Sequence, residues 1–250
     1  MKRNRERLDE RVVREGLAPS RTQAQALILA GRVLVDDAPA EKAGQAVVPE
    51  AHVRLRGEMR RFVSRGGEKL AGALADLGVD PTGQVCLDLG ASTGGFVDCL
   101  LQHGADAVIA VDVGYGQLDA KLRSDPRVHV LERTNARHLE AGVLPEIGPI
   151  GLVTVDVSFI SATLLLPRLP ALARGAEWLI LVKPQFEVGR ERVGKGGVVR
   201  DDADRSAAVV GVVQAAERLG FAPRGQAESR LPGPRGNREI FLHLVRSADK

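Results

Sequence analysis

Four charged residues occupy positions where an enzyme built on an open β-sheet places its reactive groups. Asp156 and Lys183 each end an apolar run typical of a buried strand, Glu239 opens the last such run, and Lys69 begins a helical pattern. A single polar residue at a strand end is most often a cap or an ion-pair partner, and Lys69 alone would be interpreted as a surface lysine. Four of them at one edge of a sheet instead predict a ligand site.

Two lysines and two carboxylates in one site suit proton transfer. A lysine can act as a base only when burial or a like charge lowers its pKa toward neutrality, and a second lysine nearby supplies that charge. The carboxylates would orient the two ammonium groups and balance their charge.

A glycine-rich turn follows the apolar run 85–89 and precedes a helical pattern that begins near Phe96. Such a turn lets the backbone approach a ligand and offers free N–H groups, although it can equally be only a tight connection. The dinucleotide fingerprint G-x-G-x-x-G, placed on Gly90 and Gly95, needs its middle glycine at position 92, and this chain has a serine there. The turn instead resembles the first motif of methyltransferases that bind S-adenosylmethionine, which implies cofactor contacts from Asp88, Gly90, Ala91, Ser92, Thr93, Gly94 and Gly95.

Polar residues after the next strands extend this predicted cofactor site. Asp112, followed by Val113, ends the second strand at the distance where an acid binds ribose hydroxyls. Asn135 follows the third strand and could bind the adenine edge, and Asp156 ends the fourth. These four residues complete the expected set of cofactor contacts.

From residue 68 to 250 the chain alternates strands and helices, which predicts a Rossmann-like α/β domain with a seven-stranded sheet. A short loop separates the last two strands, so we expect them to form a hairpin. The predicted strands are 85–89, 108–112, 128–131, 152–155, 178–182, 225–229 and 239–244, and the predicted helices are 68–77, 94–103, 117–124, 161–172 and 203–219.

Residues 1–60 read as a small α+β domain, joined to the larger one by a basic linker at 61–67. Helices are expected at 5–15 and 21–30, the second with a capping box of Ser20 and Gln23. Gly66 and Gly67 are expected to form a flexible joint. Short strands are predicted at 33–35, 47–48 and 53–55.

Positive charge is concentrated at the N-terminus. Residues 1–65 hold 14 Lys and Arg against 9 Asp and Glu, a net charge of +5, whereas the whole chain carries +3. This excess favours a polyanionic partner, with an ordinary solvated charged surface as the alternative.

Arg7-Leu8-Asp9, Gly16-Leu17, Ser20-Arg21 and Gly31 fall where the RNA-binding domain of ribosomal-protein type has its pattern. The resemblance implies RNA binding through arginines on phosphates. Arg7 could instead pair with Asp9 or Glu10. The candidate RNA contacts are Arg3, Arg5, Arg7, Arg14, Arg21 and Arg32, with Arg60 and Arg65 of the linker.

Lys69, Asp156, Lys183 and Glu239 match, in order, the catalytic tetrad of FtsJ-like RNA 2′-O-methyltransferases. The whole chain resembles the TlyA family, whose members 2′-O-methylate cytidines of ribosomal RNA and have also been called haemolysins. The resemblance implies S-adenosylmethionine as cofactor and ribosomal RNA or ribosomal subunits as partner. A lysine of the tetrad would then deprotonate a ribose 2′-hydroxyl as it attacks the sulfonium methyl group.

Composition argues against several other classes. No apolar run is long enough to span a bilayer, and the charged N-terminus is unlike a signal peptide, so we expect a cytoplasmic protein. Separately, we expect a monomer or weak dimer. Cys86 and Cys99 are expected to be buried thiols, and the five histidines lack ligand spacing, so no metal is expected. The remaining alternatives are a non-catalytic RNA-binding protein and a membrane-active haemolysin.

Overall fold

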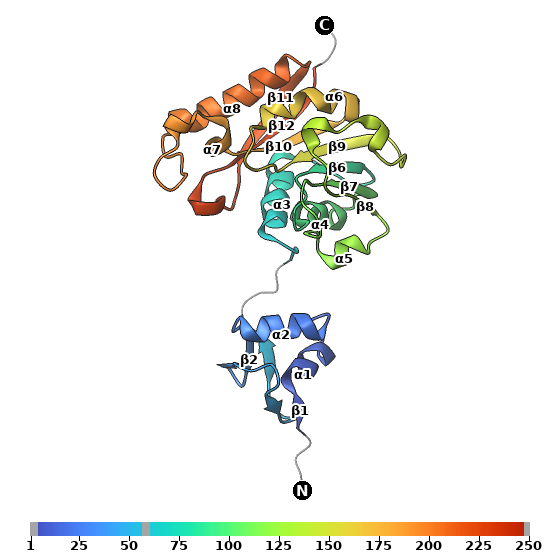
Figure 1. Cartoon of the computed structure of the whole chain (residues 1–250), viewed down its shortest axis with the longest axis vertical. Coiled ribbons are helices and arrows are strands. Elements are labelled where there is room, and N and C mark those ends of the chain that lie inside the picture. The colour runs from blue at the N-terminus through green and yellow to red at the C-terminus, as the bar shows by residue number, and fades with distance from the viewer. Residues whose placement is uncertain (1–4, 57–60, 248–250) are drawn as a thin grey trace. The chain divides into compact units, whose positions relative to one another are not determined.

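The computed structural model describes residues 5–56 and 61–247 of the chain. These residues belong to two compact units, Met1–Arg60 and Arg61–Lys250 (Figure 1). Arg3 and Arg60, both predicted RNA contacts, lie outside the described residues. None of the helices in the described ranges is long and apolar enough to cross a membrane.

The N-terminal unit packs two helices, α1 (Leu8–Arg14) and α2 (Arg21–Leu29), against short strands around a small core. The side chain of Ser20 accepts a hydrogen bond from Gln23 N and caps α2, as the capping box predicts. The helix expected from residue 5 begins only at Leu8, because residues 6–7 pair with another strand. The strands are β1 (Glu6–Arg7), β2 (Val33–Val35), β3 (Ala38–Pro39), β4 (Ala46–Val47) and β5 (Val53–Leu55).

The larger unit is built on a seven-stranded sheet with the order β11-β12-β10-β9-β6-β7-β8. Six strands run in the same direction, and β12 is antiparallel to both of its neighbours, so the last two strands form the predicted hairpin. The strands are β6 (Val85–Leu89), β7 (Ala107–Val111), β8 (Val128–Leu131), β9 (Ile150–Val155), β10 (Glu177–Val182), β11 (Phe221–Glu228) and β12 (Ile240–Arg246).

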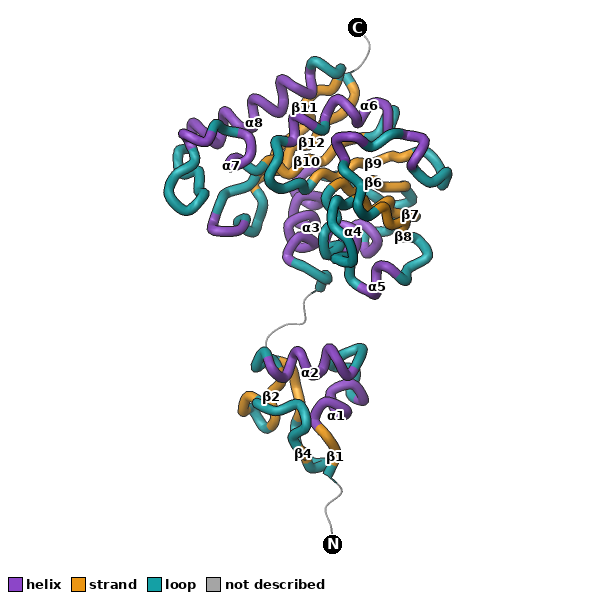
Figure 2. Tube along the Cα trace, in the orientation of Figure 1, coloured by secondary structure: helices purple, strands orange, loops and turns teal. Residues whose placement is uncertain are grey.

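Helices cover both faces of this sheet (Figure 2). Alternate strand residues face opposite sides: Cys86 and Val108 pack with residues of α3, α4 and α5, whereas Leu87 and Ile109 pack with residues of α6 and α8. The site therefore lies on a three-layer framework. The helices are α3 (Arg65–Leu77), α4 (Gly95–Gln102), α5 (Ala120–Arg123), α6 (Leu169–Leu172), α7 (Pro184–Glu187) and α8 (Asp202–Glu217), with 3₁₀ turns η1 (Ala136–His138), η2 (Ala141–Val143), η3 (Ala162–Leu164), η4 (Leu166–Arg168), η5 (Arg190–Arg192) and η6 (Pro234–Gly236).

Two sequence predictions about this unit are wrong. The long helix expected at 161–172 is broken into η3, η4 and α6, because Pro167 and Pro170 cannot donate the hydrogen bonds that a continuous helix needs. The flexible joint at Gly66 and Gly67 is instead the first turn of α3. A Cβ on Gly67 would lie only 2.3 Å from the ring of the buried Phe62, so glycine is needed there for close packing.

Candidate active site

The four predicted catalytic side chains meet as two ion pairs at the carboxyl edge of the sheet. Lys69 Nζ lies 2.5 Å from Glu239 Oε2, which joins α3 to the residue before β12. Lys183 Nζ lies 2.7 Å from Asp156 Oδ1, which joins the ends of β10 and β9. Lys69 is buried, contrary to the surface role that its position alone would suggest.

A serine that the sequence argument did not assign completes the surroundings of Lys183. Lys183 Nζ donates a hydrogen bond of 2.8 Å to Ser158 Oγ, two residues beyond Asp156. Burial raises the pKa of Asp156, while the nearby ammonium of Lys183 opposes that rise. The carboxylate of Asp156 is therefore held in a partly desolvated place beside an ammonium group.

Three adjoining cavities share these residues. A cavity of about 330 Å³ runs past the ends of β7 and β9, one of about 250 Å³ contains all four charged side chains, and one of about 310 Å³ opens beside α7. Asp156 lines the first two, and Lys183 and Glu239 line the last two. The charged residues thus separate two spaces that could hold two different molecules.

The first cavity coincides with part of the predicted cofactor set. Asp112 accepts hydrogen bonds from Ser92 N at 2.8 Å and Gly114 N at 2.6 Å, which fixes its carboxylate at the cavity wall. Asn135 caps η1 through its side-chain oxygen, so its amide group remains to bind a ligand. These groups suit ribose hydroxyls and an adenine edge. The predicted contacts that line this cavity are Gly90, Ser92, Asp112, Val113, Asn135 and Asp156.

The remaining predicted turn residues have different places. Ala91, Thr93 and Gly95 line the cavity of the four charged side chains, where Gly90 and Ser92 also contribute. Gly94 faces the protein: a Cβ there would lie 2.3 Å from Leu122 Cδ1. The glycines of this turn therefore serve close packing as well as access to a ligand. Among the described residues, no three His, Cys, Asp or Glu side chains gather as a metal site.

Asp88 is fully buried and lines none of these three cavities. It accepts a hydrogen bond of 2.7 Å from Thr154 Oγ1, its partner on the neighbouring strand β9. Burial raises the pKa of Asp88 to about 7. The structure therefore places Asp88 as a support for the strands beneath the turn, where a direct ligand contact would require it to move.

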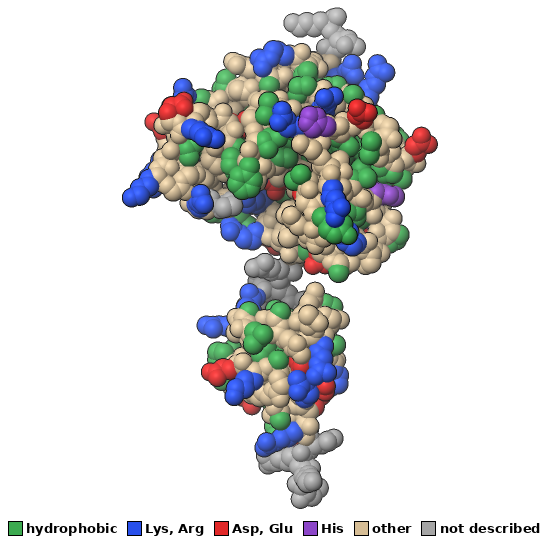
Figure 3. All heavy atoms as spheres, in the orientation of Figure 1, with side chains coloured by type: hydrophobic (Ala, Val, Ile, Leu, Met, Phe, Trp, Pro, Cys, Tyr) green, Lys and Arg blue, Asp and Glu red, His purple; other side chains and the backbone are tan. Residues whose placement is uncertain are grey.

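The predicted RNA-binding arginines of the N-terminal unit surround carboxylates. Asp9 is fully buried and binds the guanidinium groups of Arg7 and Arg21, each at 3.0 Å, and Arg14 pairs with Glu6 at 2.7 Å. Figure 3 shows Lys and Arg side chains with acidic ones among them at the surface of this unit. Arg7 and Arg21 stay about half exposed, so donors remain for phosphates.

The other predicted RNA contacts lie apart from this cluster. Arg5 is exposed and makes no ion pair with any described residue, whereas Arg32 has partners within the protein. Arg65, at the start of α3, donates a hydrogen bond of 3.0 Å to Pro232 O and lines the cavity of the four charged side chains. Arg65 therefore belongs to the border of the candidate active site.

Replacing Gly90 should test the turn. An alanine Cβ there would lie 2.6 Å from Asp156 O, and the backbone φ of +95° is unfavourable for any side chain. We expect Gly90→Ala to weaken S-adenosylmethionine binding by roughly tenfold or more, since strain of this kind costs 1–2 kcal/mol. Calorimetric titration with S-adenosylmethionine measures the affinity of each variant. Gly142→Ala, where a Cβ meets open space, is the control, and equal affinities in both variants would contradict the expectation.

Asp88→Asn should change how stability depends on pH. The carboxyl is neutral when folded up to about pH 7 but ionises near pH 4 when unfolded, so wild-type stability falls as pH rises through this window. The variant should lack this loss, which could reach roughly 4 kcal/mol at about 1.4 kcal/mol per pH unit. Thermal unfolding of both proteins at pH 5 and pH 8 covers about two of these three pH units, so the two proteins should differ in this change by roughly 3 kcal/mol. A stability difference that does not grow with pH would show that Asp88 is already ionised in the folded state.

Comparison with known proteins agrees with this geometry. Residues 62–246 match the FtsJ-like methyltransferase family, and residues 6–53 match the S4 domain. The chain is 49% identical to the Mycobacterium tuberculosis 16S/23S rRNA (cytidine-2′-O)-methyltransferase TlyA over 98% of this chain and 92% of that protein. It is 39% identical to Hemolysin A of Brachyspira hyodysenteriae over 96% and 99%.

A solved structure from Streptococcus thermophilus has the same organisation. It is 39% identical, covers 99% of this chain and 90% of that chain, and superposes with a TM-score of 0.75. Similarity of this extent, across both units, includes the turn, the strand ends and the N-terminal domain. The chain therefore belongs to the TlyA family, in which an S4 RNA-binding domain precedes an FtsJ-like methyltransferase domain.

Proposed function

We propose that Lys183 is the base that takes the proton from a ribose 2′-hydroxyl, with Asp156, Lys69 and Glu239 orienting it. The enzyme is a ribosomal RNA (cytidine-2′-O)-methyltransferase that uses S-adenosylmethionine. The observation that carries the assignment is two ion pairs in one cavity, Lys69 with Glu239 buried and Lys183 with Asp156 partly buried. Lys183 borders both the charged cavity and the third one, whereas Lys69 borders only the former.

The reaction needs an in-line approach of the hydroxyl oxygen to the sulfonium methyl group. S-adenosylmethionine would lie along the first cavity, with its adenosine near Asp112 and Asn135 and its methionine part toward the turn. The sulfonium supplies the methyl group, and its positive charge disappears on transfer. Fixing both reactants on the ends of neighbouring strands removes most of the entropic cost of alignment.

The third cavity has a wall suited to binding the acceptor nucleotide. Its wall combines two aromatic rings, Phe159 and Phe186, whose centroids lie 5.5 Å apart, with polar side chains of Gln185 and Asn237. Aromatic faces stack on an unpaired base, and amides bind its edge. Phe159 is 91% exposed, so its ring is available to an incoming base. A nucleotide extruded from folded RNA would fit between these rings and Lys183.

RNA recognition belongs to the S4 domain together with the basic segments that flank it, since residues 1–65 carry a net charge of +5. Its arginines contact phosphates and position the RNA, while the catalytic unit needs to hold only one nucleotide.

A non-catalytic RNA-binding protein would not need the charged cavity or its neighbours. The protein is proposed to act as a monomer or weak dimer in the cytoplasm.

Replacing Lys183 tests the base. Lys183→Ala should lower methyl transfer to ribosomal RNA by at least about 10²-fold, the usual range for a general base, while S-adenosylmethionine affinity stays within a few-fold. Lys183→Arg should also be inactive, because a guanidinium does not release its proton in this pH range. Filter binding of labelled methyl groups gives the rates. Lys121→Ala, at an exposed lysine outside the cavities, is the control. An active Lys183→Ala would assign the proton to another group.

Replacing Arg5 tests the RNA surface. Because Arg5 has no ion pair among the described residues, Arg5→Ala should leave the S4 domain folded. It should lower the slope of log K against log salt by roughly 0.7–0.9, the value for one phosphate contact. Salt titrations of RNA binding measure the slope. Arg127→Ala, just before the edge strand β8 of the larger unit, should leave the slope unchanged. Equal slopes for both variants would exclude Arg5 from the interface.

A further inference from the structure

Two chain segments that follow neighbouring strands form one side of the third cavity, and residues 193–197 and 235–239 line the rest. The first is residues 156–162, which follow β9 and carry Asp156, Ser158 and Phe159. The second is residues 183–187, which follow β10 and carry Lys183 and Phe186. The width of the cavity depends on how these two segments are held together.

One end of the first segment is fixed by the catalytic residues. Lys183 binds both Asp156 and Ser158, at 2.7 and 2.8 Å. The other end is fixed by Glu187, whose carboxylate accepts hydrogen bonds from Ser161 Oγ at 2.5 Å and Ala162 N at 2.8 Å. Phe159 lies between the two attachments.

The backbone between the attachments is strained. Phe159 has a φ of +68°, a left-handed conformation that a bulky side chain rarely adopts and that persists only where the surrounding structure imposes it. Its ring lies mostly in solvent, with the ring of Phe186 beside it, so burial of the Phe159 ring does not impose the conformation. The two attachments at Ser158 and at Ser161–Ala162 are the contacts that can do so.

Partial burial of the Glu187 carboxylate removes water from it, which disfavours its charged form. Burial raises its pKa, and it forms no ion pair with any described residue, so only the two hydrogen bonds offset its desolvation. An ordinary cap for a three-residue 3₁₀ turn could be a local serine, and Ser161 already serves as the cap of η3. A carboxylate brought from the next strand end instead couples two loops.

We propose that Glu187 is a positioning residue that ties residues 158–162 to residues 183–187 and thereby fixes the acceptor cavity beside Lys183. The assignment of that cavity to the acceptor rests on the proposed function. Glu187 contacts neither reactant in this account. Its loss should release Phe159 from its left-handed conformation and loosen the Ser158 contact with Lys183.

The test combines hydrogen exchange with kinetics on the full chain. Glu187→Ala should accelerate amide exchange at residues 157–162 by about tenfold or more, the effect of losing hydrogen bonds to a charged group. Its kcat/KM for ribosomal RNA should fall by more than its S-adenosylmethionine affinity does. Glu187→Gln should restore both readings to near wild type, because its amide can accept from Ala162 N and donate to Ser161 Oγ.

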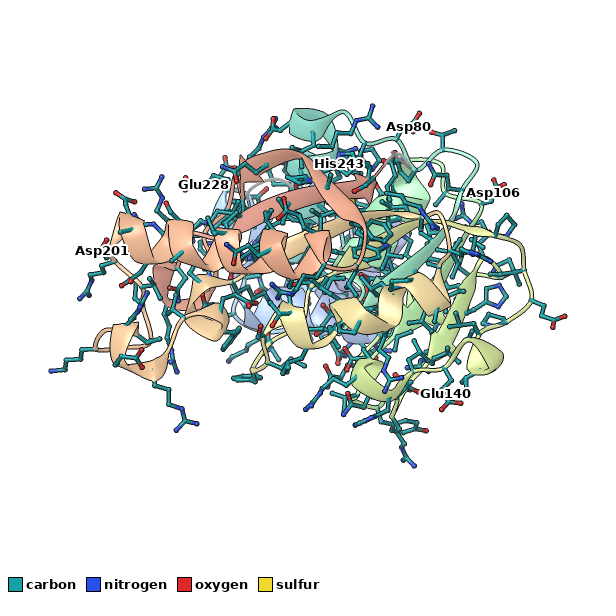
Figure 4. All side chains as sticks on the ribbon, turned by 90° about the horizontal axis from the view of Figure 1, so that it is seen from above. Asp80, Asp106, Glu140, Asp201, Glu228 and His243 are labelled. Carbon is teal, nitrogen blue, oxygen red and sulfur yellow. The ribbon has the colours of Figure 1, made fainter. Side chains whose placement is uncertain are left out.

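Two further variants complete the design. Asp201→Ala removes a helix cap of similar kind at the beginning of α8, outside the three cavities, and should leave exchange at 157–162 unchanged (Figure 4). Ser161→Ala removes one of the two contacts together with the side-chain cap of η3, and should give an intermediate effect, which keeps the proposal testable if Glu187→Ala does not fold.

Unchanged exchange at 157–162 in Glu187→Ala, or in Ser161→Ala if the former is unfolded, would overturn the proposal. Normal exchange with lost catalysis in Glu187→Gln would also overturn it, since the charge would then act in the chemistry. The exchange readout needs no RNA. A wild-type protein that methylates no RNA would therefore refute the proposed function, while the exchange data would still decide the role of Glu187.

Discussion

The buried ion pair between Lys69 and Glu239 is the constraint on which the catalytic unit depends. Lys69 is 8% exposed and Glu239 is 0% exposed, and the two residues lie near the beginning and the end of the sequence of this unit. A charge taken out of water costs several kcal/mol unless its partner stays in place, so α3 and the final hairpin must be correctly assembled together. Gly233 fits against Glu239 with no room for a Cβ, which lies 2.1 Å from Oε1 when built.

The second ion pair extends this arrangement toward the substrates. Asp156 and Lys183 occupy the ends of adjacent parallel strands, so their separation is set by strand pairing and not by loops. Asp156 borders the cavity that we propose for the cofactor, and Lys183 borders the cavity that we propose for the acceptor. A rigid sheet edge thus aligns two reactants, and the loops that follow the strands need only be fixed at a few points.

Local patterns predicted much of this architecture. The strands β6, β8 and β5 have the expected bounds, since their apolar runs end at clear turn residues, and the cap at Ser20 follows from local spacing. The candidate tetrad was predicted from its order along the chain. Its contacts, however, could not be derived from periodicity, because Lys69 and Glu239 are 170 positions apart.

The failures also have physical causes. The broken helix at 161–172 depends on prolines, whose missing donors outweigh a suitable apolar pattern. Gly66 and Gly67 suggest flexibility by composition, yet Phe62 needs the space beside Gly67. The carboxylates of Asp9, Asp88 and Glu187 gain their roles only from partners on other elements. Such roles depend on tertiary contacts that local sequence does not encode.

Identification of the methylated atom tests the central claim most directly. Ribosomal RNA would be incubated with the full-length protein and S-adenosylmethionine labelled in its methyl group, digested to nucleosides and analysed by mass spectrometry. The account predicts label on the ribose of cytidine, as 2′-O-methylcytidine, because Lys183 is proposed to take the proton of a ribose hydroxyl. Label on the base of any nucleotide, or a ribose without label, would contradict it.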